Sequence, residues 1–282
     1  MIMPSRGEEV AAILTDEETG QFARDGYLLG PQVLSEDETI RLQGETLRVI
    51  DRRDAGGVQP DIVRNLSQND AAPVWQIVNI WQASEPFRRL VAHPGIAGAI
   101  AALTGARQVR LWHDQIQYKP AATGGVNMWH QDAPYWGIIA PATQVTAWIA
   151  LDAADEDNGC MSMVPGSHRL GNRIDFLHAI PTFDAMAASC DGVPLAVRAC
   201  PVPRGHVHFH HALTFHGSGA NRSGRPRRAI ALHFMTGETR FVGSGDHLLK
   251  PFVTVADGDL LVGDKFPLVW DGGPVAPEPR SG

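Results

Sequence analysis

Two residues of the stretch Trp129–Asp132 could bind a metal ion. His130 and Asp132 are two positions apart, within a run that we predict to be a β-strand from residue 126 to residue 132. Side chains at positions i and i+2 of a strand project from the same face, so an imidazole nitrogen and a carboxylate oxygen would converge on one point. One more histidine would complete the 2-His-1-carboxylate triad that holds non-haem Fe(II) and leaves coordination positions open.

A third ligand would have to come from a later strand, where histidines are frequent. The candidates are His206, His208, His210, His211, His216 and His233. Alternation along a strand places His206, His208 and His210 on one face. That face either lines a pocket or carries ordinary hydrogen-bonded polar side chains, and we favour the second interpretation. The context distinguishes His216, because Gly-Ser-Gly-x-Asn follows it directly and Arg227 lies eleven residues further on.

Together these features make the chain resemble the phytanoyl-CoA dioxygenase (PhyH) family of Fe(II)/2-oxoglutarate-dependent oxygenases. Supporting motifs follow in order along the chain: Asp25-Gly26-Tyr27, Tyr118-Lys119-Pro120, Thr146-Ala147-Trp148, Asn158-Gly159-Cys160 and Val164-Pro165-Gly166-Ser167-His168. A lone His-x-Asp pair occurs often by chance, whereas an ordered set of motifs is specific. The resemblance extends from about residue 14 to residue 270.

The resemblance implies roles for the residues of these motifs. Three residues are expected to hold the iron: His130, Asp132 and His216. Arg227 is expected to pair with the distal carboxylate of 2-oxoglutarate, since a guanidinium can form two parallel hydrogen bonds and stays charged when buried. Arg225 and Arg228 are neighbouring alternatives, and the spacing from His216 favours Arg227. Further expected contacts of the co-substrate are Ser218, Gln117 and Trp148.

The reaction implied by the resemblance uses O₂ and 2-oxoglutarate as co-substrates. Decarboxylation to succinate and CO₂ would yield a ferryl species, which removes a hydrogen from the substrate before hydroxylation. Related halogenases replace the carboxylate ligand by a small residue, so Asp132 favours hydroxylation or another ferryl oxidation such as desaturation. The alternative is a cupin-like metal-binding isomerase or sensor without 2-oxoglutarate chemistry.

The substrate expected from the sequence is a small molecule, either a metabolite or a natural-product intermediate. An acyl-CoA carries several phosphates, and the acidic charge balance of the chain disfavours it. Aromatic residues next to the His-x-Asp pair indicate a partly apolar substrate. The candidate wall residues are Tyr135, Trp136, Asn79 and Trp81.

The elements that must position these residues change in character along the chain. Residues 1–105 are mostly helical by pattern, and Thr15, Ser35 and Ser84 are expected to cap helices. From residue 106 to residue 240, short β-rich runs separated by turns predict a sandwich or barrel. The predicted fold is mainly β with flanking helices, and the resemblance implies a double-stranded β-helix (jelly-roll, cupin-like) core.

Two long segments, residues 54–72 and residues 168–194, show no clear period. Such segments in compact domains are often functional lids. We expect a short helix in the second segment, at about residues 182–188. Residues 274–282 have the composition of a flexible tail.

Length and charge restrict the class of protein further. The chain of 282 residues suits a single domain. Its formal net charge of −7 and the lack of a Lys/Arg run argue against nucleic-acid and membrane partners. Three widely spaced cysteines indicate reduced thiols. No run approaches the ~20 apolar residues of a membrane span or resembles a secretory signal. We therefore expect a cytoplasmic protein, of open oligomeric state.

Overall fold

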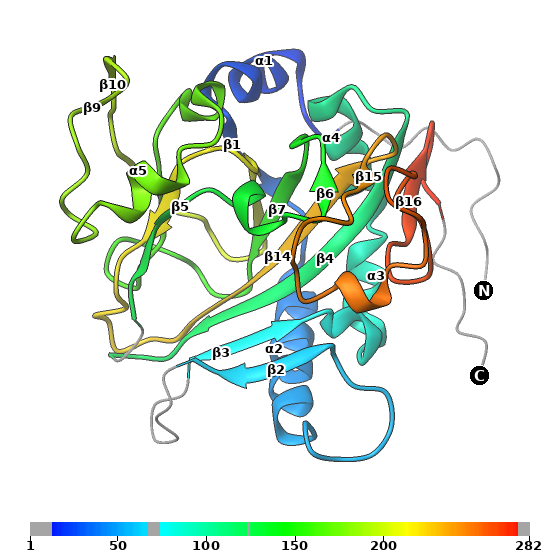
Figure 1. Ribbon diagram of the computed structural model, residues 1–282. Helices are drawn as coiled ribbons and strands as arrows, with labels where there is room; N and C mark the ends of the chain where they lie inside the picture. The colour runs from blue at the N-terminus through cyan, green and yellow to red at the C-terminus, as the bar shows by residue number, and fades with distance from the viewer. Residues whose placement is uncertain (1–12, 67–73, 123–124, 276–282) are drawn as a thin grey trace.

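The computed structural model describes residues 13–66, 74–122 and 125–275, and two antiparallel sheets form its centre (Figure 1). The larger sheet has eight strands, in the order β1 (Tyr27–Gln32), β12 (His206–His211), β7 (Val145–Ala150), β14 (Arg227–Thr236), β4 (Gln108–Lys119), β3 (Trp75–Val78) and β2 (Ile62–Asn65), with β16 (Leu268–Asp271) also paired to β4. The smaller sheet has four strands, in the order β11 (Arg198–Cys200), β8 (Met161–Met163), β13 (His216–Ser218) and β5 (Asn127–His130).

Shorter elements connect and cover the two sheets. Two small ladders join β15 (Arg240–Phe241) to β6 (Ile139–Ala140) and β10 (Val193–Pro194) to β9 (Ser189–Cys190). The single-turn helices are η1 (Ile80–Gln82), η2 (Ala133–Tyr135), η3 (Ser167–Leu170) and η4 (Lys250–Phe252). The longer helices are α1 (Asp16–Asp25), α2 (Glu36–Asp51), α3 (Glu85–Val91), α4 (Pro94–Thr104) and α5 (Ile174–His178).

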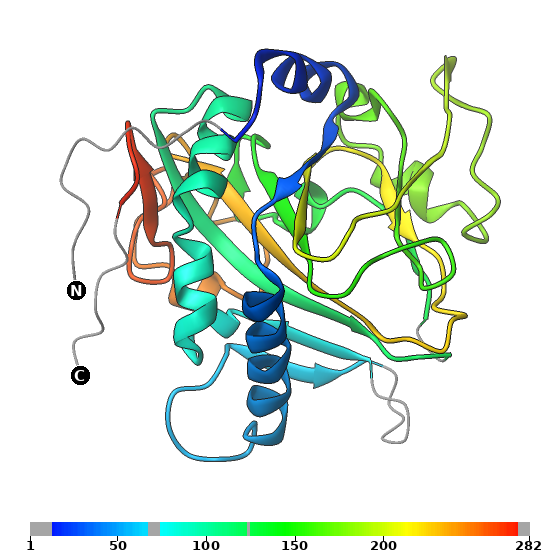
Figure 2. The same cartoon turned by 180° about the vertical axis from the view of Figure 1, so that it is seen from behind.

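Strand alternation divides the larger sheet into two faces. One face packs against the helices and forms the main core, with members such as Ile116, Ala147, Phe209 and Leu232. Figure 2 shows α2 and α4 lying across that face. The other face turns toward the smaller sheet, and its side chains include Gln117, Thr146, Trp148, His210 and His233. The mainly β fold with flanking helices predicted from the sequence is therefore confirmed.

The first two helices begin where the capping residues predict. The Thr15 hydroxyl accepts from the backbone N–H of Glu18 at the start of α1, and Ser35 does the same with Glu38 at the start of α2. Both are complete capping boxes, because each glutamate also accepts from the backbone of its cap residue. Ser84 precedes α3 as expected, but its hydroxyl donates to Glu45 at 2.7 Å instead of capping the helix.

The β core extends beyond the predicted range 106–240, because β1, β2 and β3 precede it and β16 follows it. The strand β2 lies inside the segment 54–72, which we expected to be irregular throughout. The helix predicted at residues 182–188 is absent from these described residues, and α5 occurs earlier in the same segment. The predicted tail starts at residues 274 and 275, which still pair with the β16 region, while residues 276–282 lie outside the described ranges.

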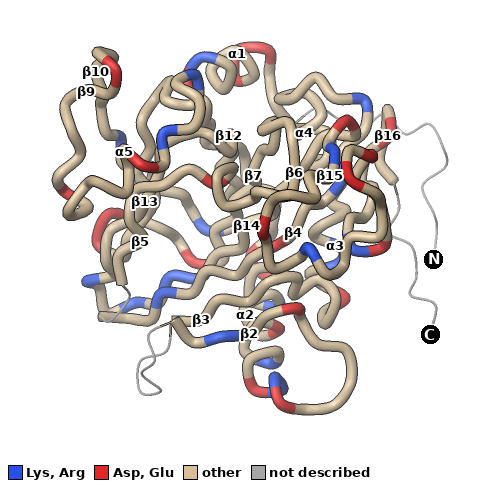
Figure 3. Tube along the Cα trace, viewed as in Figure 1, with Lys and Arg blue, Asp and Glu red and all other residues tan. Residues whose placement is uncertain are grey.

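Charged residues of both signs are interspersed along the trace (Figure 3). Within the described ranges, the helices are all too short or too polar to cross a lipid bilayer.

Candidate active site

The three predicted metal ligands lie together at one end of the smaller sheet. His130 is the last residue of β5, and it pairs directly with His216, the first residue of β13. Their ring centroids are 4.1 Å apart. Asp132 lies beyond the strand, where the backbone has turned helical (φ −73°, ψ −45°) ahead of η2. Strand alternation is thus the wrong reason for the convergence of His130 and Asp132, which results from the turn after β5.

Hydrogen bonds of the two imidazoles leave the same nitrogen free on each ring. Nδ1 of His130 lies 2.7 Å from the carbonyl of Met128, and Nδ1 of His216 lies 2.9 Å from the carbonyl of Thr214. A carbonyl oxygen can only accept, so each Nδ1 carries the proton and each Nε2 presents a lone pair. This is the tautomer that a metal ligand requires.

The two free nitrogens face one oxygen of Asp132. Oδ1 of Asp132 is 3.7 Å from Nε2 of His130 and 3.6 Å from Nε2 of His216. The three potential ligand atoms all lie within 4.8 Å of one another. Three acceptor atoms turned toward one point, with no proton between them, repel unless a cation sits among them. The donor set therefore fits a divalent metal ion, and the predicted triad is confirmed.

Burial and neighbouring groups together keep the ligands in their metal-binding protonation states. Burial lowers the pKa of His130 to about 4, with a further contribution from the neighbouring His216. Burial likewise lowers the pKa of His216. Burial alone would raise the pKa of Asp132, but His216 and then His210 hold it well below its ordinary value. The site thus consists of neutral imidazoles and an ionised carboxylate at neutral pH.

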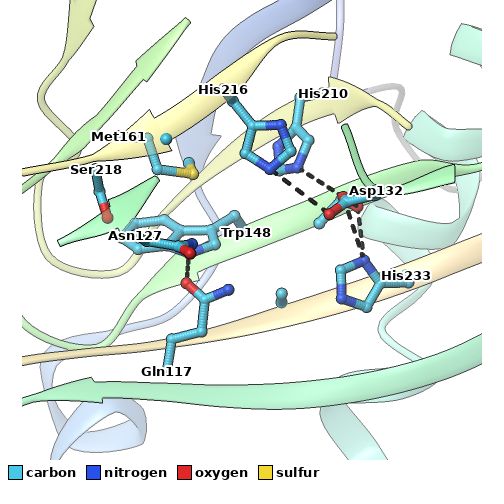
Figure 4. A pocket seen from close by; sticks show the side chains of 12 residues that line it. Gln117, Asn127, Asp132, Trp148, Met161, His210, His216, Ser218 and His233 are labelled. Atoms are coloured by element: carbon cyan, nitrogen blue, oxygen red, sulfur yellow. Dashed lines mark hydrogen bonds and ion pairs between the residues drawn. The ribbon is translucent and has the colours of Figure 1, made fainter. Parts of the chain in front are cut away.

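A small pocket begins at the triad and runs between the two sheets (Figure 4). Its lining includes Asp132, His216, Gln117, Trp148 and Ser218, among others. The indole N–H of Trp148 donates to Oε1 of Gln117 at 3.1 Å. The structure thus brings Gln117, Trp148 and Ser218 to the pocket, and their contact with a co-substrate stays a prediction.

Arg227 lies next to this pocket and is buried, yet part of its guanidinium has no hydrogen-bond partner among the described residues. The residue is 1% exposed, and its guanidinium lies over the Trp148 ring at 5.4 Å. Its Nε and Nη1 groups have no partner among the described residues. Burying a cation with unmet N–H groups is costly, and an incoming carboxylate would satisfy them. Arg227 therefore fits the distal carboxylate of 2-oxoglutarate.

Lys119 is a second buried basic residue beside Arg227, and we did not predict it as a site residue. It lies directly opposite Arg227 in the β4–β14 ladder, and its Nζ donates to Oγ of Ser218 at 2.7 Å. Burial, and then the charge of Arg227, lower the pKa of Lys119 to about 6. The sequence did carry a signal, since Lys119 is part of Tyr118-Lys119-Pro120 and is two positions from Gln117.

His210 corrects our interpretation of the histidine-rich strand β12. Its Nε2 lies 3.4 Å from Oδ2 of Asp132, and the side chain lines the pocket. His208 is 1% exposed, and neither ring nitrogen finds a partner in the described part of the chain. His206 is half-buried beside the carbonyl of Arg204. Treating the three as ordinary hydrogen-bonded polar residues is therefore wrong for His208 and His210.

Gln131, between the two ligands of the His-x-Asp pair, is another residue that we did not predict. It is fully buried, and its Nε2 donates to the carbonyls of Gly171 at 2.8 Å and Leu213 at 2.7 Å. Its Oε1 accepts from the backbone N–H of Arg173 at 2.7 Å. Leu213 precedes His216 by three residues, so one side chain ties both ligand-bearing segments together. No motif or residue spacing in the sequence predicts this role of Gln131.

Among the predicted substrate contacts, Tyr135 lies beside the triad. Its ring centroid is 6.3 Å from that of His130, and its hydroxyl is 2.9 Å from Nε2 of His178 in α5. The side chain is 51% exposed, so it stands at the mouth of the site. Trp136 is buried instead, with its ring edge-on to His233 at 4.9 Å.

None of the four predicted substrate residues is part of the described pocket lining, and the other two lie away from the triad. Asn79 and Trp81 are buried in and beside η1, where the indole N–H of Trp81 donates to Oδ1 of Asn79 at 3.1 Å. Asn79 also donates to Asp61 at 2.7 Å. Both side chains hold η1 in place, because the run from 78 to 82 forms a helical turn where we expected an extended strand.

Comparison with known proteins gives a consistent result. The family described as Phytanoyl-CoA dioxygenase (PhyH) matches residues 22–229. The peroxisomal phytanoyl-CoA dioxygenase of Rattus norvegicus is 22% identical over 268 residues, which cover 87% of this chain and 76% of that protein.

Two solved structures also resemble this chain over most of its length. The non-heme alpha ketoglutarate dependent carbocyclase SnoK from nogalamycin biosynthesis is 29% identical, with a TM-score of 0.70 and coverage of 90% of this chain and 96% of that one. The epimerase SnoN, solved with Fe³⁺, alpha ketoglutarate and nogalamycin RO, is 25% identical, with a TM-score of 0.67 and coverage of 90% and 97%.

These matches agree with the metal triad and with the cationic end of the pocket. They argue against the cupin-like isomerase or sensor, which would need neither Arg227 nor 2-oxoglutarate. They also confirm the jelly-roll core, since the similar structures are 2-oxoglutarate-dependent enzymes of the same architecture. The chain belongs to the phytanoyl-CoA dioxygenase (PhyH) family and is an Fe(II)- and 2-oxoglutarate-dependent dioxygenase.

Proposed function

We propose that this enzyme hydroxylates a small metabolite or natural-product intermediate that binds at the mouth of the site, beside Tyr135 and His178. The observation that carries this proposal is the position of Tyr135. Its ring is half exposed and lies next to the ligand His130, and its hydroxyl is hydrogen-bonded to His178 in α5. A ring held in this way can pack against a partly apolar substrate.

Different residues would bind the metal and the co-substrate. Iron(II) with 2-oxoglutarate and O₂ supplies an oxidant that acts on C–H bonds, with succinate and CO₂ as co-products. His130, Asp132 and His216 would hold the ion through the atoms that face one another. Arg227 and Lys119 would hold the distal carboxylate of 2-oxoglutarate, and the Trp148 ring beneath Arg227 would keep water from that end.

The size of the pocket supports a substrate at its mouth. The pocket is narrow, and the space of about 310 Å³ around its lining includes open solvent. 2-Oxoglutarate would take up much of the pocket, so the substrate must approach from outside, over the side of His130. Charges of both signs are interspersed along the trace in Figure 3, and the formal net charge of the chain is −7. This charge balance suits a neutral or weakly charged molecule better than one with several phosphates.

A second outcome, ring closure or epimerisation, is supported by the two similar structures. SnoK is described as a carbocyclase and SnoN as an epimerase, and both are more similar in sequence to this chain than the rat phytanoyl-CoA dioxygenase is. Neither ring closure nor epimerisation adds an oxygen atom to the product. The two outcomes therefore differ in the mass of the product.

The test is substrate-dependent release of succinate. The enzyme would be loaded with Fe(II) and incubated with 2-oxoglutarate, O₂ and a panel of polyketide, amino-acid-derived and acyl-CoA compounds. The masses of the products would be measured by mass spectrometry. We expect stimulation by a compound without CoA and a product that contains one oxygen atom from ¹⁸O₂. A product of unchanged oxygen content would favour the second outcome, and stimulation by acyl-CoA alone would contradict the proposal.

The role of Tyr135 has its own control. Tyr135→Ala should raise the KM for the substrate several-fold and leave the affinity for 2-oxoglutarate unchanged. Phe252→Ala removes a ring of comparable exposure (40%) that lies against the ammonium group of Lys265, and it should change neither value. Equal KM values for wild type and Tyr135→Ala would show that the substrate lies elsewhere.

A further inference from the structure

The two oxygens of the Asp132 carboxylate face different neighbours. Oδ1 faces the lone pairs of His130 and His216. Oδ2 faces hydrogen-bond donors from the larger sheet, namely Nε2 of His210 at 3.4 Å and the hydroxyl of Thr146 at 3.3 Å. Figure 4 shows His210 and His216 approaching the carboxylate from one side and His233 from the other. One oxygen is thus turned toward the metal position and the other toward the protein.

The direction of the hydrogen bonds through Thr146 follows from its single hydroxyl proton. Its Oγ1 is 3.3 Å from Oδ2 of Asp132 and 2.7 Å from Nδ1 of His233. The carboxylate can only accept, so Thr146 donates to Asp132 and must accept from the Nδ1–H of His233. His233 also lies 4.0 Å from Oδ2 itself. The chain of donors runs one way, from His233 through Thr146 to the carboxylate.

His210 approaches the same oxygen from the neighbouring strand. It is 2% exposed, and its Nδ1 has no partner among the described residues, so the carboxylate is the group its ring is placed to meet. The strands β7, β12 and β14 are adjacent in the larger sheet, which fixes His210, Thr146 and His233 relative to one another. A rigid sheet is a suitable support for groups that orient a ligand.

We infer that His210 and Thr146, the latter oriented by His233, are positioning residues that hold Oδ2 so that Asp132 binds the metal through Oδ1 alone. This inference rests on the proposed function as an iron-dependent oxygenase. A carboxylate that bound through both oxygens would occupy one more coordination position. Holding Oδ2 within the protein would leave Oδ1 for the ion and would keep coordination positions free for 2-oxoglutarate and O₂.

Metal binding without turnover tests this inference. Thr146→Val and His210→Phe remove the donors at nearly constant shape, and the probes are Mn(II) by calorimetry and Co(II) by visible absorption. We expect each variant to bind Mn(II) about 10-fold more weakly, as for other residues that orient a metal ligand. The Co(II) spectrum should shift toward a higher coordination number.

Matched variants separate positioning from general damage. Thr146→Ser restores the hydroxyl and His210→Gln restores an N–H donor, so both should recover most of the affinity. Thr143→Val, whose hydroxyl contacts Thr236 at 3.1 Å, should leave metal binding unchanged. The thermal unfolding temperature of every variant would confirm that it is folded.

The result that overturns the inference is an affinity within about twofold of wild type, with an unchanged Co(II) spectrum, in both donor-deleting variants. Equal weakening by Thr146→Val and Thr146→Ser would overturn it as well, because the hydroxyl would then be irrelevant. His130→Ala tests the metal centre itself. If that variant retained the wild-type affinity, the proposed function would fail, whatever the result at Thr146.

Discussion

Gln131 and Leu213 are joined by a hydrogen bond of 2.7 Å, from the side-chain amide to the backbone carbonyl. This bond ties the segment that carries His130 and Asp132 to the segment that leads into His216. The two ligand-bearing strands belong to the same small sheet, and the buried amide sets their spacing at the end where the metal would sit.

Removal of this link should weaken both the fold and the metal site. Gln131→Ala leaves two carbonyls and one N–H without their partner in the interior, which we expect to lower the free energy of unfolding by about 3 kcal/mol. Urea unfolding measures this loss. Gln59→Ala, which removes an exposed amide bonded to two backbone carbonyls, should cost less than about 0.5 kcal/mol. Similar losses in the two variants would refute the special role of Gln131.

Arg227 should control the affinity for 2-oxoglutarate. Arg227→Met removes the buried guanidinium, and the loss of charge-assisted hydrogen bonds should weaken 2-oxoglutarate binding at least about 10-fold. Calorimetry on the Mn(II) form measures this. Arg228→Met is the matched control, because Arg228 is paired with Asp152 at 2.7 Å on the opposite face of the strand. An unchanged affinity in Arg227→Met, or equal effects in both variants, would place the co-substrate elsewhere.

Lys119 should make 2-oxoglutarate binding depend on pH. Burial lowers its pKa to about 6, so above pH 6 the free enzyme holds a neutral amine. A carboxylate beside the amine stabilises the charged form and raises its pKa, so binding takes up a proton. Affinity should therefore fall as the pH rises from 6 to 8. Lys119→Met should bind more weakly at pH 6 and lose this dependence, whereas an unchanged pH profile would exclude Lys119 from the site.

The capping boxes provide a test of the helical part that is independent of the site. Ser35→Ala removes the hydroxyl that accepts from Glu38 at the start of α2 and should cost about 1 kcal/mol of stability. Ser35→Asp keeps an acceptor and should be nearly neutral. Denaturant titration distinguishes the two, and an equal loss in both would mean that the cap contributes little.

The sequence predicted the parts of this molecule that depend on local pattern or on ordered motifs. The capping boxes at Thr15 and Ser35 are local, and the triad follows from the motif around His216. The turn that aims Asp132 at the other ligands is set by packing after β5, so strand alternation could not describe it.

Other contacts depend on which strands become neighbours. Lys119 faces Arg227, and His210 faces Asp132, only because β4 pairs with β14 and because β12 lies opposite β5 and β13 across the pocket. Those pairings join residues about a hundred positions apart, and no spacing in a single sequence specifies them. For the same reason, the sequence does not reveal that Asn79 and Trp81 hold η1 and lie outside the described pocket lining.

The most direct test of the central claim is the visible absorption of the anaerobic enzyme after addition of Fe(II) and then 2-oxoglutarate. Chelation of iron by 2-oxoglutarate produces a charge-transfer band, which requires the metal triad and the co-substrate site together. We expect the band in wild type and in the control His206→Ala, and its loss in His216→Ala and Asp132→Ala. A band of wild-type intensity in His216→Ala would contradict the assignment of His130, Asp132 and His216 as the iron ligands.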